Sequence, residues 1–178
     1  MKPLFRKPLQ QGASTVEFAL VAMLFFTMLL GTIEFGRLIY VWNTVQEVSR
    51  NAARQLVVTD FNDAAAISTI KRSAVFRTTD GSLPAAAKIS NAAIRVQYLN
   101  GAGTAPVLMP TDPGDNIAAC LDSTRTDSCI RLVEVSICSG TPCSPVQYVP
   151  MINLFPFLAL NIPMATVRMP AESLGFRP

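Results

Sequence analysis

An uncharged apolar run near the amino end constrains this chain more than any other feature. The run extends from Phe18 to Ile33 and reads FALVAMLFFTMLLGTI, sixteen residues in all. The carboxylate of Glu17 stands directly before it, and an ionised carboxylate at membrane depth costs a few kcal/mol or more unless it is paired. Glu17 therefore either lies harmlessly near the membrane interface, or it is held there because a partner supplies a positive charge.

A short basic segment, residues 1–12, precedes the run and reads MKPLFRKPLQQG. Its three basic residues account for the whole net charge of +3, because the rest of the chain carries 12 basic and 12 acidic residues. Basic residues before an apolar run keep that end in the cytoplasm, which predicts that the chain beyond the run is translocated. Residues 13–178 carry no net charge and no cluster of basic residues that could bind nucleic acid, so no nucleic-acid partner is expected.

The chain contains no histidine. This absence removes the Ser-His-Asp and Cys-His arrangements of hydrolases and the usual zinc ligand. The phosphate-binding, dinucleotide-binding, nucleophile-elbow and metalloprotease motifs are absent as well. Residues 111–116 resemble a fragment of a calcium loop, but their two carboxylates are three residues apart and the later glutamate is missing, which favours a plain turn. We expect a protein that is not an enzyme and that holds no metal or cofactor.

A single long helix is expected from residue 13 to about residue 59, because no proline occurs between Pro8 and Pro84. Residues 13–36 would form its membrane-spanning part, since about 20 residues cross the hydrocarbon core. Farther along, apolar residues recur at steps of three and four and predict a stripe that packs on a sheet or on another helix. The stripe comprises Leu38, Val41, Val45, Val48, Ala52 and Leu56.

Two features mark the point where this helix leaves the apolar zone. Glu34 and Arg37, three residues apart, can pair on one helix face. Gly31 and Gly36 permit close helix packing or a mild bend at the same level.

The rest of the chain predicts a small domain of mixed structure. A second helix is expected over residues 63–77, capped by Asn62 or Asp60. Alternating apolar and polar residues predict strands at 93–99, 130–137 and 165–169, and residues 103–129 are expected to form a long loop. The predicted fold class is α+β, with a long transmembrane helix that extends into a domain where the second helix packs on a short antiparallel sheet. The expected divisions are 1–12, 13–59 and 60–178.

A second apolar segment, residues 146–164, is interrupted by three prolines, which argue against a second membrane span. We interpret it as a loop that covers the core. The alternative is an exposed loop that contacts a partner or the outer membrane surface.

Four cysteines fall within 24 residues and show no metal-ligand spacing. An even number beyond a membrane segment indicates disulfides in an oxidising compartment, and four cysteines allow three pairings. We favour Cys120–Cys129 and Cys138–Cys143, because short loops cost least to close. Four buried reduced thiols are the alternative.

The amino-terminal signal has three possible interpretations: a cleaved secretory signal, a simple anchor and a prepilin signal. Residues 29–36 offer a poor secretory cleavage site, and a simple anchor does not explain Glu17. The block GASTVEFAL at 12–20, followed by GTIEFGRL at 31–38 and SRNAAR at 49–54, resembles the TadE-like family. These are pseudopilins of the tight-adherence (Flp) pilus system.

The resemblance implies a role for each amino-terminal position. Gly12 would precede the cut made by prepilin peptidase, Ala13 would become the amino terminus, and Glu17 would be the fifth mature residue. The new ammonium would lie one helical turn from Glu17, on the same face. The family further implies a minor pseudopilin in the bacterial inner membrane, with a cytoplasmic amino terminus and a periplasmic domain. Its partners would be other pilins and the inner-membrane assembly platform. The rival interpretation is a membrane-tethered binding or sensor domain.

Overall fold

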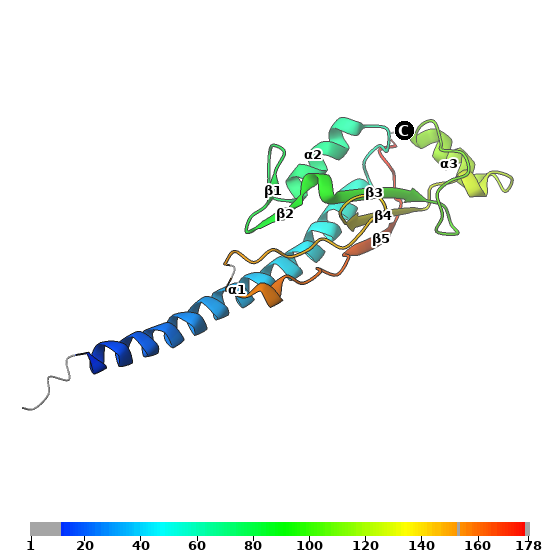
Figure 1. Ribbon diagram of the computed structural model, residues 1–178. Coiled ribbons are helices and arrows are strands. Elements are labelled where there is room, and N and C mark those ends of the chain that lie inside the picture. Colours follow the sequence, from blue (N-terminus) through cyan, green and yellow to red (C-terminus); the bar gives the residue numbers. More distant parts are fainter. Residues whose placement is uncertain (1–11, 153, 177–178) are drawn as a thin grey trace, which may run out of the picture.

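The computed structural model describes residues 12–152 and 154–176, and it confirms the α+β class (Figure 1). This part of the chain contains three α-helices, five β-strands and three short 3₁₀-helical turns. The helices are α1 (Ala13–Leu56), α2 (Ala64–Ala74) and α3 (Pro113–Leu121). The strands are β1 (Ser82–Leu83), β2 (Ala86–Ser90), β3 (Ile94–Leu99), β4 (Leu132–Ile137) and β5 (Thr166–Pro170).

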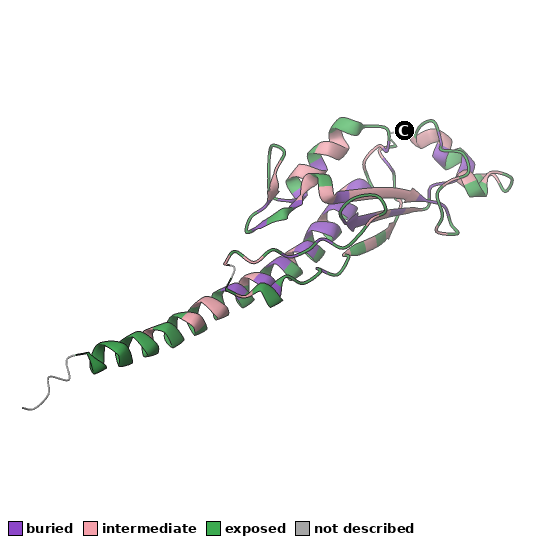
Figure 2. Cartoon of the chain, viewed as in Figure 1, coloured by how far each residue is buried: buried purple, intermediate pink, exposed green. Residues whose placement is uncertain are grey.

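Helix α1 is 44 residues long and projects far beyond the domain (Figure 1). Its amino half is exposed, whereas one face of its carboxyl half is buried (Figure 2). The predicted stripe is confirmed, because all six of its residues are at most 5% exposed. The helix ends three residues earlier than predicted, at Leu56.

The sheet beneath this stripe has three antiparallel strands in the order β3-β4-β5. Helix α1 contacts β4 and β5, so the long helix itself covers the sheet. Val133 and Val135 of β4 are fully buried in the core between them. Glu134 of β4 and Arg168 of β5 stand opposite each other and form an ion pair.

Helix α2 packs against α1 and against the short turn at 91–93. It is shorter than predicted, and its amino-terminal cap is Asp63, whose side chain accepts a hydrogen bond from the Ala66 amide at 2.8 Å. Asp60, one of the two predicted caps, instead accepts from the Asn62 amide within the preceding turn. The β1–β2 hairpin that follows was not predicted, because β1 has only two residues and cannot show an alternating pattern.

The prediction of a loop over 103–129 is wrong in part, because α3 lies within it. Residues 111–116 are the start of this helix and not a plain turn. Asp112 is the cap and accepts from the Asp115 amide at 2.8 Å, while Pro113 occupies the first turn. A capping aspartate followed by proline is a helix-start signal, which the resemblance to a calcium loop obscured.

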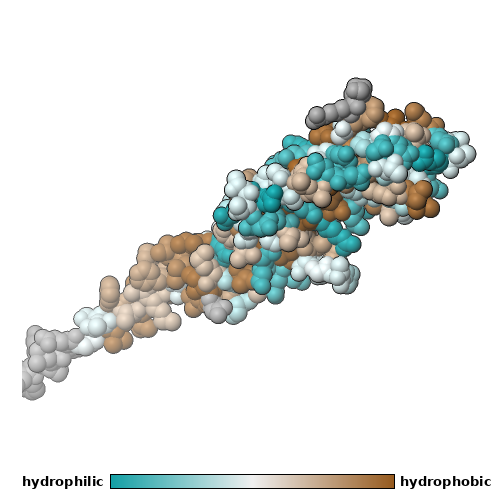
Figure 3. Space-filling view, turned by 90° about the horizontal axis from the view of Figure 1, so that it is seen from above, coloured by the Kyte–Doolittle hydropathy of each residue, from teal (hydrophilic) through white to brown (hydrophobic). Residues whose placement is uncertain are grey.

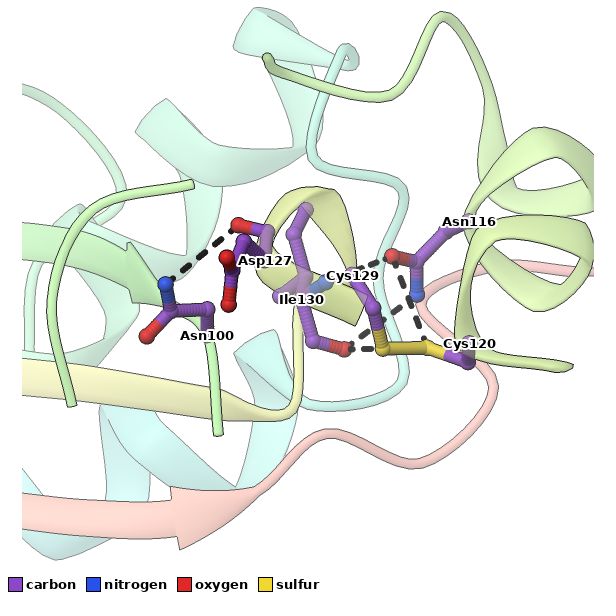
Figure 4. The surroundings of a disulfide bond; sticks show 6 residues. All are labelled: Asn100, Asn116, Cys120, Asp127, Cys129 and Ile130. Carbon is purple, nitrogen blue, oxygen red and sulfur yellow. Dashed lines mark hydrogen bonds between the residues drawn. A yellow bond between two sulfur atoms is a disulfide. The ribbon is translucent and has the colours of Figure 1, made fainter. Parts of the chain in front are cut away.

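The disulfide between Cys120 and Cys129 fastens α3 to the chain that leads into β4 (Figure 4). Beside it, Asn116 accepts from the Ile130 amide at 2.7 Å and donates to the Ile130 carbonyl at 3.3 Å (Figure 4). The second disulfide joins Cys138 to Cys143. Both pairs are those favoured from the sequence.

The carboxyl-terminal segment closes the domain over the end of α1. The amides of Glu172 and Leu174 both donate to the Val57 carbonyl at 3.2 Å. Gly175 follows with φ +84°, and a Cβ there would lie 2.6 Å from the Asp60 nitrogen. No side chain fits at this position, so the segment depends on glycine.

Candidate functional site

The amino end of α1 carries the residues predicted for processing. Helix α1 begins at Ala13, and Gly12 precedes it as the capping residue without a side-chain cap. The Val16 amide donates to the Gly12 carbonyl at 3.3 Å. A Cβ at Gly12 would meet no atom within 4 Å, so no residue that the structure describes crowds this position.

Glu17 lies on the first turns of α1 and is exposed. It forms no ion pair with any residue that the structure describes. Its position four residues after Ala13 places it one turn along the same helix face.

The helix that follows presents its apolar side chains outward. Phe18 is 74% exposed and Met23 is 71% exposed. Figure 3 shows this half of the helix as a continuous hydrophobic surface, in contrast to the mixed surface of the domain. In the described residues, α1 is the one helix that is long and apolar enough to cross a membrane, which suggests single-pass anchoring.

The two glycines of α1 have different surroundings. A Cβ on Gly31 would lie 3.3 Å from Cζ of Phe155, so Gly31 gives room for an aromatic ring of the same chain. Gly36 is exposed, and a Cβ there would meet nothing within 4 Å. Gly36 therefore leaves a flat position on α1 that another helix could approach.

Between these two glycines, a buried carboxylate joins α1 to the domain. Glu34 is only 2% exposed. Its Oε1 accepts hydrogen bonds from the Tyr148 hydroxyl at 2.5 Å, from Arg37 Nη1 at 2.9 Å and from the Met151 amide at 3.2 Å. The predicted pair of Glu34 and Arg37 is present, and it forms part of a larger network.

Arg37 extends this network to two further segments. Its Nε donates to the Ala85 carbonyl of the β1–β2 turn at 2.8 Å, and its Nη1 donates to the Val149 carbonyl at 3.1 Å. The guanidinium carbon lies 4.9 Å from the centre of the Tyr148 ring, a cation–π arrangement. One side chain thus ties α1 to the hairpin and to the apolar segment that begins at residue 146.

Tyr148 stays a hydrogen-bond donor over the whole physiological range. Burial, and then its hydrogen bond to Glu34, raise the pKa of Tyr148 to about 12. Because the pKa in the folded state lies above the ordinary value of about 10, this contribution to stability is complete below that pH. The stabilisation is lost progressively as the pH rises from about 10 through about 12.

A small cavity of about 250 Å³ adjoins the network, between α1, β2 and residues 147–151. Its lining includes Arg37, Val41, Ile89 and Ile162 and is mostly apolar. Small-molecule sites are usually larger, about 300–1,000 Å³, so the cavity is a weak candidate for a ligand.

A known protein family is similar to the amino-terminal part of the chain. The family described as TadE-like protein matches residues 12–54. No curated protein and no solved structure matches the chain. The resemblance seen in the sequence is confirmed over these residues. The TadE-like family has structural and assembly roles in pilus systems.

The TadE-like segment begins at the predicted cut and ends two residues before the end of α1. It contains Gly12, Glu17, Glu34 and Arg37, whereas both disulfides lie outside it. The residues within the segment are predictable from the sequence. Tyr148 is not, because nothing in the sequence links a tyrosine to a carboxylate 114 residues away.

Proposed function

We propose that the chain is a minor pseudopilin of a Flp/Tad-type pilus assembly or a related secretion system. One observation carries the proposal: the TadE-like segment coincides with a helix whose apolar amino half is exposed, apart from the contact of Phe155 at Gly31. Such a surface needs a membrane before assembly and neighbouring helices afterwards. The role is structural.

In this proposal residues 1–12 are a leader, Ala13–Leu56 is the long helix, and the residues that follow it belong to the extracytoplasmic domain. Residues 1–11 lie outside the described residues. Prepilin peptidase cuts between Gly12 and Ala13, and the open surroundings of Gly12 support this step. The domain lies on the periplasmic side of the bacterial inner membrane, with the amino terminus in the cytoplasm.

The cut creates an ammonium at Ala13, and the carboxylate of Glu17 is placed to form an ion pair with it. The carboxylate lies one helical turn away and forms no ion pair with the described residues. It pairs with its own amino terminus or with that of a neighbouring subunit, and either pairing lowers the cost of a carboxylate near the hydrocarbon.

Assembly then moves α1 from lipid into a bundle of pilin helices. The exposed apolar side chains from Phe18 to Ile33 pack against those helices, and the open face at Gly36 allows close approach. The inner-membrane assembly platform and the other pilins of the system are the partners in this step.

The processing step is tested by replacing Gly12 with valine. A β-branched side chain at the residue before the cut is expected to leave residues 1–12 attached, and the intact mass of the protein from its bacterial host reports this directly. Gly36→Val is the matched control, because it makes the same change at an exposed position of the same helix; it should be processed as the wild type is. If the Gly12→Val chain still begins at Ala13, the peptidase does not require glycine before the cut, and the proposed processing step is refuted.

A membrane-tethered binding or sensor domain remains the second candidate, and the cavity beside Arg37 is the observation that favours it. A tethered domain needs no charge at Glu17. The Glu17→Leu variant therefore separates the two functions.

A further inference from the structure

The apolar segment predicted as a loop has two parts with opposite surroundings. Its stem, Val146, Tyr148, Leu158 and Ile162, is buried in the core, as the first interpretation expected. Its tip is exposed: Met151 is 71%, Leu154 51%, Phe157 71% and Leu160 46% accessible. We call these four residues, together with Phe155, the apolar tip. No charged residue occurs anywhere between positions 144 and 167.

The stem fixes where the tip lies. The Tyr148 amide donates to the Leu160 carbonyl at 2.8 Å, and the Ile162 amide donates to the Val146 carbonyl at 2.9 Å. The segment thus runs along α1 toward its amino end and returns, as the gold and orange trace beside α1 shows (Figure 1). Phe155 rests on Gly31, and its ring centre lies 6.0 Å from that of Phe157. The tip therefore reaches the level of the apolar run.

The apolar run alone is too short to cross a bilayer. Its sixteen residues span about 24 Å as a helix, against a hydrocarbon core of about 30 Å. The charges that end the run are Glu34 and Arg37. Both are covered, because their side chains are only 3% and 16% exposed.

With these charges covered, the outward face of α1 stays uncharged as far as Trp42. The distance from Phe18 to Trp42 is about 37 Å along the helix, which is enough for the core and part of the interface. Phe35 and Ile39 are exposed within this stretch, and Tyr40 and Trp42 follow them. Tyrosine and tryptophan are the residues that gather at membrane interfaces.

We propose that the apolar tip inserts into the bilayer leaflet on the side of the domain, beside α1. The tip and the exposed face of α1 form one uncharged surface at the same depth, so the lipid that covers α1 near Gly31 also covers the tip. The insertion covers Glu34 on the membrane side and fixes the height of the domain above the bilayer. This inference requires that α1 spans a membrane, and it holds whether or not the chain enters a pilus.

Tryptophan fluorescence of the full chain in phosphatidylcholine vesicles tests the insertion. Trp42 is the single tryptophan, so Trp42→Phe gives a silent background for single probes. Phe157→Trp reports on the tip, and Phe26→Trp, on the exposed apolar run, reports on α1. Leu121→Trp, at an 83% exposed position of α3, is the matched control for any preference of tryptophan itself. The vesicles contain phosphatidylcholine with acyl chains brominated near the headgroup or near the bilayer centre.

We expect the emission of Phe157→Trp to shift to the blue and to be quenched mainly by bromine near the headgroup. Phe26→Trp should be quenched mainly by bromine near the centre, and Leu121→Trp should stay red-shifted and unquenched.

Four results would overturn the proposal. Red-shifted, unquenched emission from Phe157→Trp beside quenched emission from Phe26→Trp overturns the insertion, and unquenched emission from Phe26→Trp overturns the span on which it rests. Blue-shifted emission from Phe157→Trp without quenching, rising with the protein-to-lipid ratio, overturns it in favour of contact between copies of the chain. Equal quenching of the Leu121→Trp and Phe157→Trp variants overturns it as well.

Discussion

Replacing Arg37 with leucine is expected to destabilise the domain by about 3 kcal/mol, because it leaves the buried carboxylate of Glu34 without its counter-charge. Arg37 also supplies the hydrogen bonds to the carbonyls of Ala85 and Val149, which lose their donor at the same time. For a chain of this size the loss corresponds to a melting temperature lower by about 6–12 °C. Thermal unfolding of the full chain in detergent micelles, followed by near-ultraviolet circular dichroism, measures it.

Two further variants separate charge from packing. Arg54→Leu removes an exposed arginine of the same helix that forms no ion pair with the described residues, and it should change stability by less than about 0.5 kcal/mol. The double variant Glu34→Gln/Arg37→Leu should regain the part of the loss that is due to the unpaired charge, because a neutral amide oxygen still accepts from Tyr148 and Met151. The carbonyls of Ala85 and Val149 still lack their donor in this variant. If the double variant is no more stable than Arg37→Leu alone, an uncompensated charge is not the cause.

Replacing Glu17 with leucine is expected to abolish most assembly while the protein remains in the membrane. A hydrogen bond to a charged group contributes about 2 kcal/mol, so losing one at each subunit contact lowers incorporation about 30-fold. Leucine is more favourable than a carboxylate in hydrocarbon, so membrane retention should be unchanged or increased. Pilus yield and surface adhesion, with immunoblots of the membrane fraction, measure both effects.

Glu17→Asp and Glu47→Leu are the controls for this variant. Aspartate keeps the charge at the same position and should restore much of the assembly. Glu47 is an exposed acid on the same helix, 30 positions farther along and beyond the apolar run, so its loss should have little effect. Normal piliation by Glu17→Leu would favour the tethered binding or sensor domain.

The sequence was sufficient for features that depend on local periodicity. The stripe from Leu38 to Leu56 is buried as its spacing predicts, because a helix with one apolar face has only one way to pack it. The three strands of the β3-β4-β5 sheet follow the alternating segments within a few residues. The disulfide pairing follows from loop length, since each bridge closes a loop of fewer than ten residues.

Features that depend on distant partners were not predictable. The pair of Glu34 and Arg37 was visible as a helical spacing, but its burial depends on Tyr148, which the fold brings from the other end of the chain. The split of the segment 146–164 into a buried stem and an exposed tip has the same origin. Composition shows only that the segment is apolar, whereas its return along α1 decides which side chains face the core.

The amino-terminal residue of the protein isolated from bacterial membranes tests the central claim most directly. We expect sequencing from this end to begin at Ala13 and to read ASTVEF, with residues 1–12 absent. A chain that begins at Met1, or at any residue other than Ala13, would contradict processing at Gly12. The carboxylate of Glu17 would then have no ammonium one turn away to pair with.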